Sequence, residues 1–186
     1  FLLAILAAFQ LASSVAYAVE YETQIQPKHL RVSWTSDPAT AAIVSWSTLK
    51  PTDNHALRFR LKDTEGDYSV ITPIQGRFQS AKTELHYHHA NLSGLEPGTA
   101  YEFQITQSED ASKSFYFSTA PDVDRPLSLL HGGDSRSDQT TRQKMNLLIS
   151  KLVKESYDDE VLSNDIIALA HGGDYVADGS NLNQWS

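Results

Sequence analysis

The tetrapeptide His-Gly-Gly-Asp occurs twice in the sequence and ends at Asp134 and Asp174. Each copy directly follows an apolar run, at residues 127–130 and 166–170. Adjacent strands lie about 4.8 Å apart, so two carboxylates at equivalent strand ends can approach closely. Like charges that close are unfavourable unless a cation lies between them. Two metal ions about 3.5–4 Å apart, bridged by one carboxylate, would suit this spacing. The repeat therefore predicts a metal site.

A strand–helix–strand unit is needed to bring the two aspartates together. The apolar runs predict two buried strands, and the segment between them predicts a helix over about residues 138–157, with Asp138 as its N-cap. One face of this helix is apolar and consists of Met145, Leu148, Ile149, Leu152 and Val153. Strands joined in this way should be parallel and adjacent. Their carboxyl ends then meet at the sheet edge where open α/β sheets bind ligands.

Other side chains near the repeat suggest supporting roles. His131 and His171 each lie three residues before an aspartate, on the opposite strand face, so we expect core or supporting positions. Arg136 is a candidate to bind phosphate bidentately, through two of its guanidinium N–H groups. An ion pair with Asp138 is the alternative. For the aspartates themselves, capping of the following turn is the alternative. Their repetition on consecutive apolar strands favours the metal site.

Composition excludes several classes of function. The formal net charge is −8, which argues against a nucleic-acid-binding surface. The sequence has no cysteine, so neither disulfides nor thiolate metal sites can form. Neither Gly-Asp loop carries Gly-x-Gly-x-x-Gly, and the sequence lacks Gly-Lys-Ser/Thr. A dinucleotide fold is therefore disfavoured, and a nucleotide phosphate loop is excluded.

Residues 26–120 show a period of two, which predicts short strands of an antiparallel all-β sandwich. Alternating segments occur at residues 30–34, 42–46, 57–61, 101–105 and 115–117. Pro97 and Gly98 predict a turn, after which the Tyr101 hydroxyl can bond back to the preceding loop. The string Leu-Glu-Pro-Gly-Thr-Ala-Tyr at 95–101 resembles that of fibronectin type III domains.

Aromatic and histidine residues of this region are expected to have structural roles. Trp34, Trp46 and Phe59 occupy inward strand positions. His86 and His88 would share one strand face while His89 points to the other, so we expect structural roles for them and not a metal site.

Residues 1–18 form an apolar run that closes on Ala16-Tyr17-Ala18, a small-x-small cleavage pattern. The run lacks an initiator Met and a basic start, so it is interpreted as part of a secretory signal peptide. It is short for a transmembrane span, which needs about 20 apolar residues. We therefore expect a secreted or periplasmic protein that has no membrane segment after signal cleavage.

The combination of a β-sandwich, a Pro-bounded linker at 121–126 and two strand-ending Gly-Asp motifs resembles the purple acid phosphatases and related metallophosphoesterases. This resemblance implies a fibronectin-III-like sandwich at 26–120. It also implies the first βαβ part of an α/β (αββα sandwich) calcineurin-like metallophosphoesterase domain at 126–186. Asp134 would ligate one metal and Asp174 would bridge both. In the family a metal-bound hydroxide attacks the phosphorus of a small phosphate monoester.

The sequence departs from the family pattern at two positions. Purple members carry a tyrosine three residues after the second aspartate, where this chain has Ala177, while Tyr175 follows Asp174 directly. Tyr175 is therefore only a candidate ligand, and the metal pair is left open among Fe, Zn and Mn. Relatives often have His at the position of Arg136. The remaining motifs of the family would follow Ser186, so we expect residues 1–186 alone to hydrolyse no ester.

Two further interpretations stay open beside the phosphatase. One is an extracellular fibronectin-III-type binding module without catalysis, which would favour an exposed aromatic patch. The other is a phosphodiesterase or nucleotidase on the same scaffold, since substrate choice resides in later loops. The sequence does not fix the oligomeric state.

Overall fold

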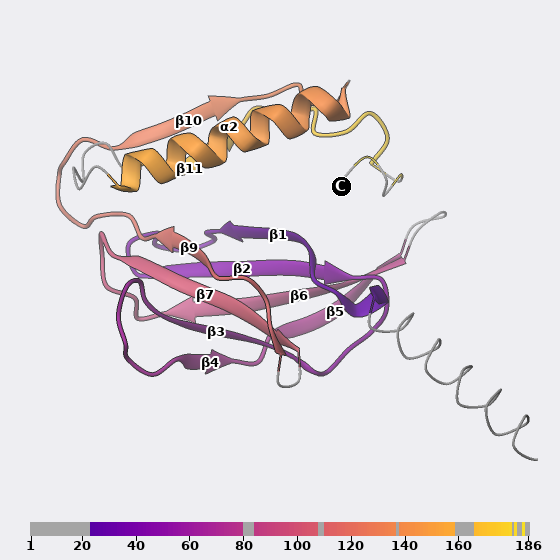
Figure 1. Ribbon diagram of the computed structural model, residues 1–186, viewed down its shortest axis with the longest axis horizontal. Coiled ribbons are helices and arrows are strands. Elements are labelled where there is room, and N and C mark those ends of the chain that lie inside the picture. Colours follow the sequence, from indigo (N-terminus) through magenta and orange to yellow (C-terminus); the bar gives the residue numbers. More distant parts are fainter. Residues whose placement is uncertain are drawn as a thin grey trace, which may run out of the picture.

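The computed structural model describes residues 23–79, 84–107, 110–136, 138–158, 166–179, 181 and 184. It has an antiparallel β-sandwich, followed after residue 118 by a smaller unit of two strands and one helix (Figure 1). The predicted signal peptide at 1–18 lies outside the described residues. Among the residues described, no helix is both long and apolar enough to cross a membrane.

The sandwich consists of two sheets whose strand pairs are all antiparallel. The first has the order β1 (Lys28–Ser33), β2 (Ala41–Thr48), β6 (Glu84–Ser93), β5 (Ile74–Gln79). The second has the order β4 (Ser69–Ile71), β3 (His55–Leu61), β7 (Ala100–Gln107), and both β8 (Asp110–Ala111) and β9 (Phe115–Ser118) pair with β7. The predicted all-β sandwich is confirmed.

The core of the sandwich lies between the sheets and consists of alternate residues of their central strands. Its buried members are Ala42, Val44, Trp46, Leu57, Ala90, Leu92, Leu95, Tyr101, Phe103, Ile105 and Phe117. Trp34 and Phe59 are partly buried and pack against this core. The three aromatic residues predicted to point inward therefore do so.

The turn before β7 has the predicted geometry. Gly98 has a φ of 60°, a left-handed conformation that glycine adopts without steric cost. The Tyr101 hydroxyl accepts a hydrogen bond of 2.8 Å from the backbone N–H of Glu96. This contact is the predicted tyrosine corner, and it ties the start of β7 to the loop before it.

Replacing Tyr101 by phenylalanine should lower the free energy of unfolding by about 1 kcal/mol, because the half-buried Glu96 N–H loses its acceptor. The ring stays stacked on Phe117, so the core volume is kept. Urea unfolding would show a lower midpoint with an unchanged slope. An unchanged midpoint would mean that water replaces the phenol at no cost.

A Trp–His–His cluster occupies one end of the core. The Trp46 ring stacks on His88 with centroids 5.3 Å apart, and the centroids of the His55 and His88 rings are 5.4 Å apart. Trp46 and His88 are fully buried, and His55 is 2% exposed. His88 therefore packs as a core residue, which agrees with the structural role expected for it.

Hydrogen bonds define which ring nitrogens of this cluster carry protons. The Trp46 indole N–H donates to His55 Nδ1 at 3.1 Å, so the His55 proton is on Nε2. The Thr48 hydroxyl donates to the Lys50 carbonyl at 2.6 Å and therefore accepts from His88 Nε2 at 3.1 Å. His88 Nδ1 is then a bare acceptor, and within the described structure it has no hydrogen-bond partner. Both rings are neutral in this arrangement.

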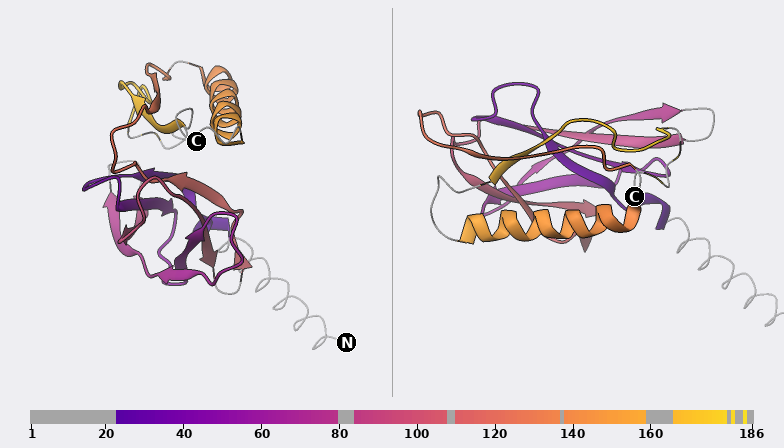
Figure 2. Two further views of the ribbon diagram at one scale, coloured as in Figure 1. Left: turned by 90° about the vertical axis from the view of Figure 1, so that its left-hand side faces the viewer. Right: turned by 90° about the horizontal axis from the view of Figure 1, so that it is seen from above.

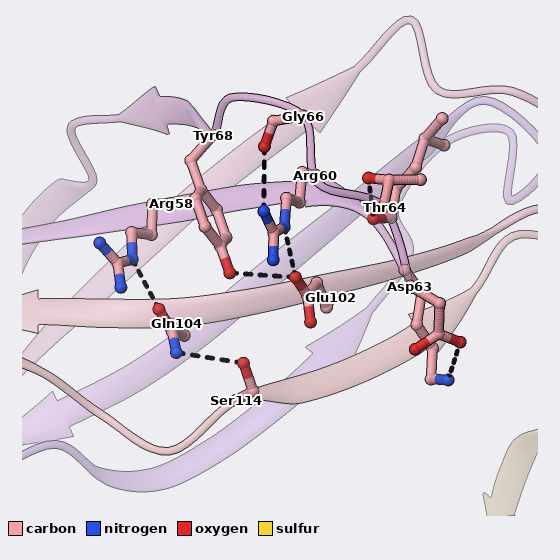
Figure 3. A network of polar contacts seen from close by, with 11 residues as sticks. Arg58, Arg60, Asp63, Thr64, Gly66, Tyr68, Glu102, Gln104 and Ser114 are labelled. Atoms are coloured by element: carbon pink, nitrogen blue, oxygen red, sulfur yellow. Dashed lines mark hydrogen bonds and ion pairs between the residues drawn. The ribbon is translucent and has the colours of Figure 1, made fainter.

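Polar side chains on the outer face of the second sheet connect β3, β7 and the loop before β4 (Figure 3). The Tyr68 ring lies between two guanidinium groups, 4.6 Å from that of Arg58 and 4.3 Å from that of Arg60. Glu102 accepts hydrogen bonds from Arg60 and from the Tyr68 hydroxyl. The bond from Arg60 lowers the pKa of Glu102 below its usual value. These contacts hold the loop before β4 against the sheet.

The second unit consists of β10 (Ser128–Gly132), α2 (Gln139–Asp158) and β11 (Ile166–His171). β10 and β11 pair in parallel, and α2 lies along one side of them (Figure 2). The predicted strand–helix–strand unit with adjacent parallel strands is confirmed. Asp138 caps the helix, since its Oδ1 accepts from the backbone N–H of Thr140 at 2.9 Å.

Burial of this unit was overestimated by the sequence pattern. Leu129 of β10 is 59% exposed, Leu169 of β11 is 49% exposed and Leu148 on the apolar helix face is 48% exposed. The prediction of two buried strands is therefore wrong for the described chain. A 20-residue helix is about 30 Å long, whereas strands of five or six residues span about 17–20 Å. Two such strands cannot cover it.

Candidate metal-binding site

The two Gly-Asp loops meet at the carboxyl ends of β10 and β11. Gly132 pairs with His171, so the two copies of the tetrapeptide leave the sheet one residue out of register. Beyond the strands, the Gly172 N–H donates to the Gly132 carbonyl at 2.7 Å, and the Asp134 N–H donates to the Gly173 carbonyl at 3.0 Å. These bonds continue the ladder into the loops and fix their relative position.

Both aspartates adopt the left-handed backbone conformation, with φ of 51° for Asp134 and 56° for Asp174. Gly173, directly before Asp174, has a φ of 109°. The sequence analysis did not predict the left-handed conformation of the two aspartates. Aspartate is one of the few residue types other than glycine that tolerate this region, because its short carboxylate can bond locally. That tolerance was the signal in the sequence.

Replacing Gly173 by alanine should lower the free energy of unfolding of the β10–α2–β11 unit by at least about 1 kcal/mol, because a Cβ is strained at this φ. Gly132→Ala is the matched control. A Cβ at Gly132 meets no atom within 4 Å, and its φ lies outside the left-handed region. Hydrogen exchange of the β11 amides measures both variants. Equal protection in the two would contradict the conformational role of Gly173.

The two carboxylates converge on one guanidinium. Arg136 Nε lies 3.4 Å from Asp134 Oδ1, and its Nη1 lies 3.0 Å from Asp174 Oδ2. The three side chains are partly exposed, at 46% for Arg136, 71% for Asp134 and 52% for Asp174. The structure thus brings together the three residues singled out in the sequence. Arg136 contacts these two carboxylates instead of making the alternative pair with Asp138.

The arrangement is compatible with a cation bound between the carboxylates. Two oxygen donors from adjacent loops already approach the same positive charge, and carboxylate oxygens suit Mn²⁺, Zn²⁺ and iron ions. No group of three or more His, Asp or Glu side chains suited to a metal occurs among the described residues. Asp134 and Asp174 could therefore supply carboxylate oxygens to a bound cation, but the described residues do not complete a coordination shell.

The remaining candidates lie beside the carboxylates. The Tyr175 ring stacks on His171 with centroids 3.7 Å apart. His171 also interacts with the Ser135 hydroxyl at 3.3 Å and accepts from the Gly173 N–H at 3.2 Å, so it supports both loops, as expected. His131 is exposed, so of the two positions expected for it, core or supporting, the core position is excluded.

Helix α2 begins directly after the first loop. Thr141 donates to both Asp138 oxygens through its backbone N–H and its hydroxyl. These hydrogen bonds, that of the Thr141 side chain first, hold the pKa of Asp138 below its usual value. Asp138 is therefore an ionised cap that fixes where the helix starts. Arg136 contacts Asp134 and Asp174 instead.

Comparisons with known proteins point to one family. The sequence model of the purple acid phosphatase N-terminal domain matches residues 27–119. Purple acid phosphatase PPD1 from yellow lupin (Lupinus luteus) seeds is 14% identical, with 79% of this chain and 34% of that chain covered and a TM-score of 0.49. This chain therefore spans about a third of the lupin enzyme. A search of curated proteins gives no match.

Two other solved structures are similar over parts of the chain. A computationally redesigned β-sandwich protein is 22% identical, with 52% of this chain and 96% of that chain covered and a TM-score of 0.38. The vertebrate protein Astrotactin-2 is 18% identical, with 72% and 26% covered and a TM-score of 0.40. The family match spans 93 of the 186 residues, which is half of the sequence. On that match, the chain belongs to the purple acid phosphatase family.

Proposed function

We propose that the chain is part of a secreted phosphoesterase with a dinuclear metal centre, in which Asp134 and Asp174 are metal ligands. One observation carries this proposal: carboxylates from two adjacent parallel strands reach the same cation, the Arg136 guanidinium. Family membership supports a phosphatase. Fe, Zn and Mn all suit the oxygen donors, so the metal pair stays open.

The chain's own residues would have distinct roles in hydrolysis of a small phosphate monoester. When bound, the metal pair supplies an activated water and neutralises charge that develops on the phosphate. Asp134 and Asp174 would hold the metals through their carboxylate oxygens at the carboxyl ends of β10 and β11. Arg136 would bind a phosphate oxygen through its planar guanidinium. Tyr175 is a further candidate ligand, and its ring stacks on His171.

The proposed domain organisation follows the sequence interpretation. Residues 26–120 would be the fibronectin-III-like N-terminal domain, and residues 126–186 would begin the αββα metallophosphoesterase domain. The exposed apolar side chains of β10, α2 and β11 are consistent with a unit that belongs to a larger sheet. Residues 1–18 would direct secretion or periplasmic export, and we propose neither a nucleic-acid partner nor a membrane anchor after cleavage.

The binding-module alternative has less support. Such a module would favour an exposed aromatic patch, yet Trp46 is fully buried and Trp34 and Phe59 pack against the core. A module without catalysis would also have no need for two carboxylates held near one cation at a sheet edge.

Activity assays test the proposal directly. The intact protein, purified and loaded with Zn²⁺, Mn²⁺ or iron, should hydrolyse p-nitrophenyl phosphate and lose that activity on chelation. Residues 1–186 alone should show no turnover. Faster hydrolysis of bis-p-nitrophenyl phosphate would favour the phosphodiesterase alternative, and an intact protein inert with every metal would leave the binding module as the better interpretation.

A further inference from the structure

The guanidinium of Arg136 occupies the position where a cation would balance both carboxylates. It contacts Asp134 Oδ1 at 3.4 Å and Asp174 Oδ2 at 3.0 Å through different nitrogens. Arg136 lies only two residues after Asp134, so this positive charge is tethered to the site. The guanidinium therefore relieves the repulsion between the two carboxylates.

We propose that Arg136 is a displaceable counter-cation, which pairs with Asp134 and Asp174 in the metal-free chain and is expelled when a metal ion binds. The inference rests on the proposed function of these aspartates as metal ligands. It adds that loading of the site is a competition between a metal ion and an arginine of the same chain.

The relative strength of the two interactions makes displacement feasible. Ion pairs between partly exposed side chains contribute about 0–1 kcal/mol each, because water screens them and ordering the side chains costs entropy. A divalent ion carries twice the charge and binds carboxylate oxygens at about 2.0–2.2 Å, closer than a guanidinium nitrogen can approach. Arg136 is 46% exposed, so its side chain has room to rotate toward solvent.

Displacement also has a consequence for anion binding. While Arg136 is paired with two carboxylates, its positive charge is already balanced and phosphate gains little from approaching it. A metal ion would free the guanidinium within two residues of Asp134, next to the position where a phosphate would bind. Binding of inorganic phosphate should therefore require prior metal binding.

Titration with Mn²⁺ alone tests the competition without any assay of activity. Mn²⁺ broadens the amide NMR signals of nearby residues, and the signals of Gly133, Asp134, Gly173 and Asp174 report its affinity even when binding is weak. Arg136→Gln should bind Mn²⁺ roughly three- to ten-fold more tightly than the wild type, since one or two competing ion pairs are lost. Arg136→Lys keeps a charge without the planar fork and should lie between them.

Arg142→Gln is the matched control. The Arg142 guanidinium donates to the Tyr175 carbonyl at 3.1 Å and so contacts the same loop through its backbone. This variant should bind Mn²⁺ with wild-type affinity. Equal or weaker Mn²⁺ affinity in Arg136→Gln would overturn the competition. Absence of broadening in every variant would instead contradict the proposed metal site itself, so the two failures are distinguishable.

Discussion

Replacing Asp174 by asparagine should reduce metal-dependent hydrolysis of p-nitrophenyl phosphate by the intact protein about 100-fold or more. Asparagine keeps the shape of the side chain and one oxygen but removes the negative charge. A metal contributes several kcal/mol to transition-state stabilisation, and each 1.36 kcal/mol changes the rate about tenfold. If Asp174 contacts both metals, as the family resemblance implies, Asp174→Asn should have a larger effect than Asp134→Asn.

Asp178→Asn is the matched control for this prediction, because Asp178 lies four residues further along the same segment. Its backbone N–H donates to the Gln184 side chain at 2.9 Å, away from the carboxylate pair. The control should retain activity within about two-fold, because Asp178 is not one of the two carboxylates that contact Arg136. If Asp174→Asn retained wild-type turnover with normal metal content, Asp174 would not be a ligand.

The sandwich could be predicted from sequence because its signals are local and mutually consistent. Alternation in β2, β3 and β7 fixes which side chains enter the core, and the Pro97–Gly98 turn fixes the start of β7. The hydrogen bond predicted between the Tyr101 hydroxyl and the preceding loop is confirmed. Features that depend on one strand and its own turn are visible in a single sequence.

The candidate site was predictable only in part. The repeated tetrapeptide gave the parallel strands and the convergence of the two aspartates, because βαβ connections have few alternatives. The pairing of Arg136 with both carboxylates was not predicted, since it depends on the left-handed turns at Asp134 and Asp174. The predicted burial of Leu129 and Leu169 is wrong, because the apolar content of a strand shows which side chains favour burial. It does not show whether another element packs against them.

The sequence analysis predicted a structural role for His88 but not its contacts with Trp46 and His55. Register places His88 opposite Trp46 in the first sheet, while His55 comes from β3 of the facing sheet. Which histidines meet across a sandwich depends on how two sheets pack, and no local pattern encodes that. The consequence for stability follows from the chemistry of two neutral, buried rings.

The sandwich should lose about 2 kcal/mol of stability between pH 8 and pH 5 because of His88. Burial, and then the neighbouring His55, His86 and His89, lowers the pKa of His88 to about 4, while Asp53 opposes this. In the unfolded chain the histidine pKa is about 6.5, so between pH 6.5 and pH 4 the unfolded chain binds a proton at His88 that the folded chain does not bind. The contribution of neutral His88 to the free energy of unfolding is therefore fully present above pH 6.5. It falls as the pH drops toward 4, where the total loss reaches about 3 kcal/mol.

Urea unfolding at several pH values between 8 and 5 measures this slope, above the range where most carboxylates titrate. His55, whose pKa burial also lowers, should act in the same direction. His88→Gln removes the titrating ring, so the stability of this variant should depend much less on pH. The glutamine amide can still donate to the Thr48 hydroxyl in place of the His88 ring. The exposed His131→Gln should keep the wild-type slope. Equal slopes in His88→Gln and wild type would mean that His88 is protonated in the folded core, with an acceptor for its Nδ1.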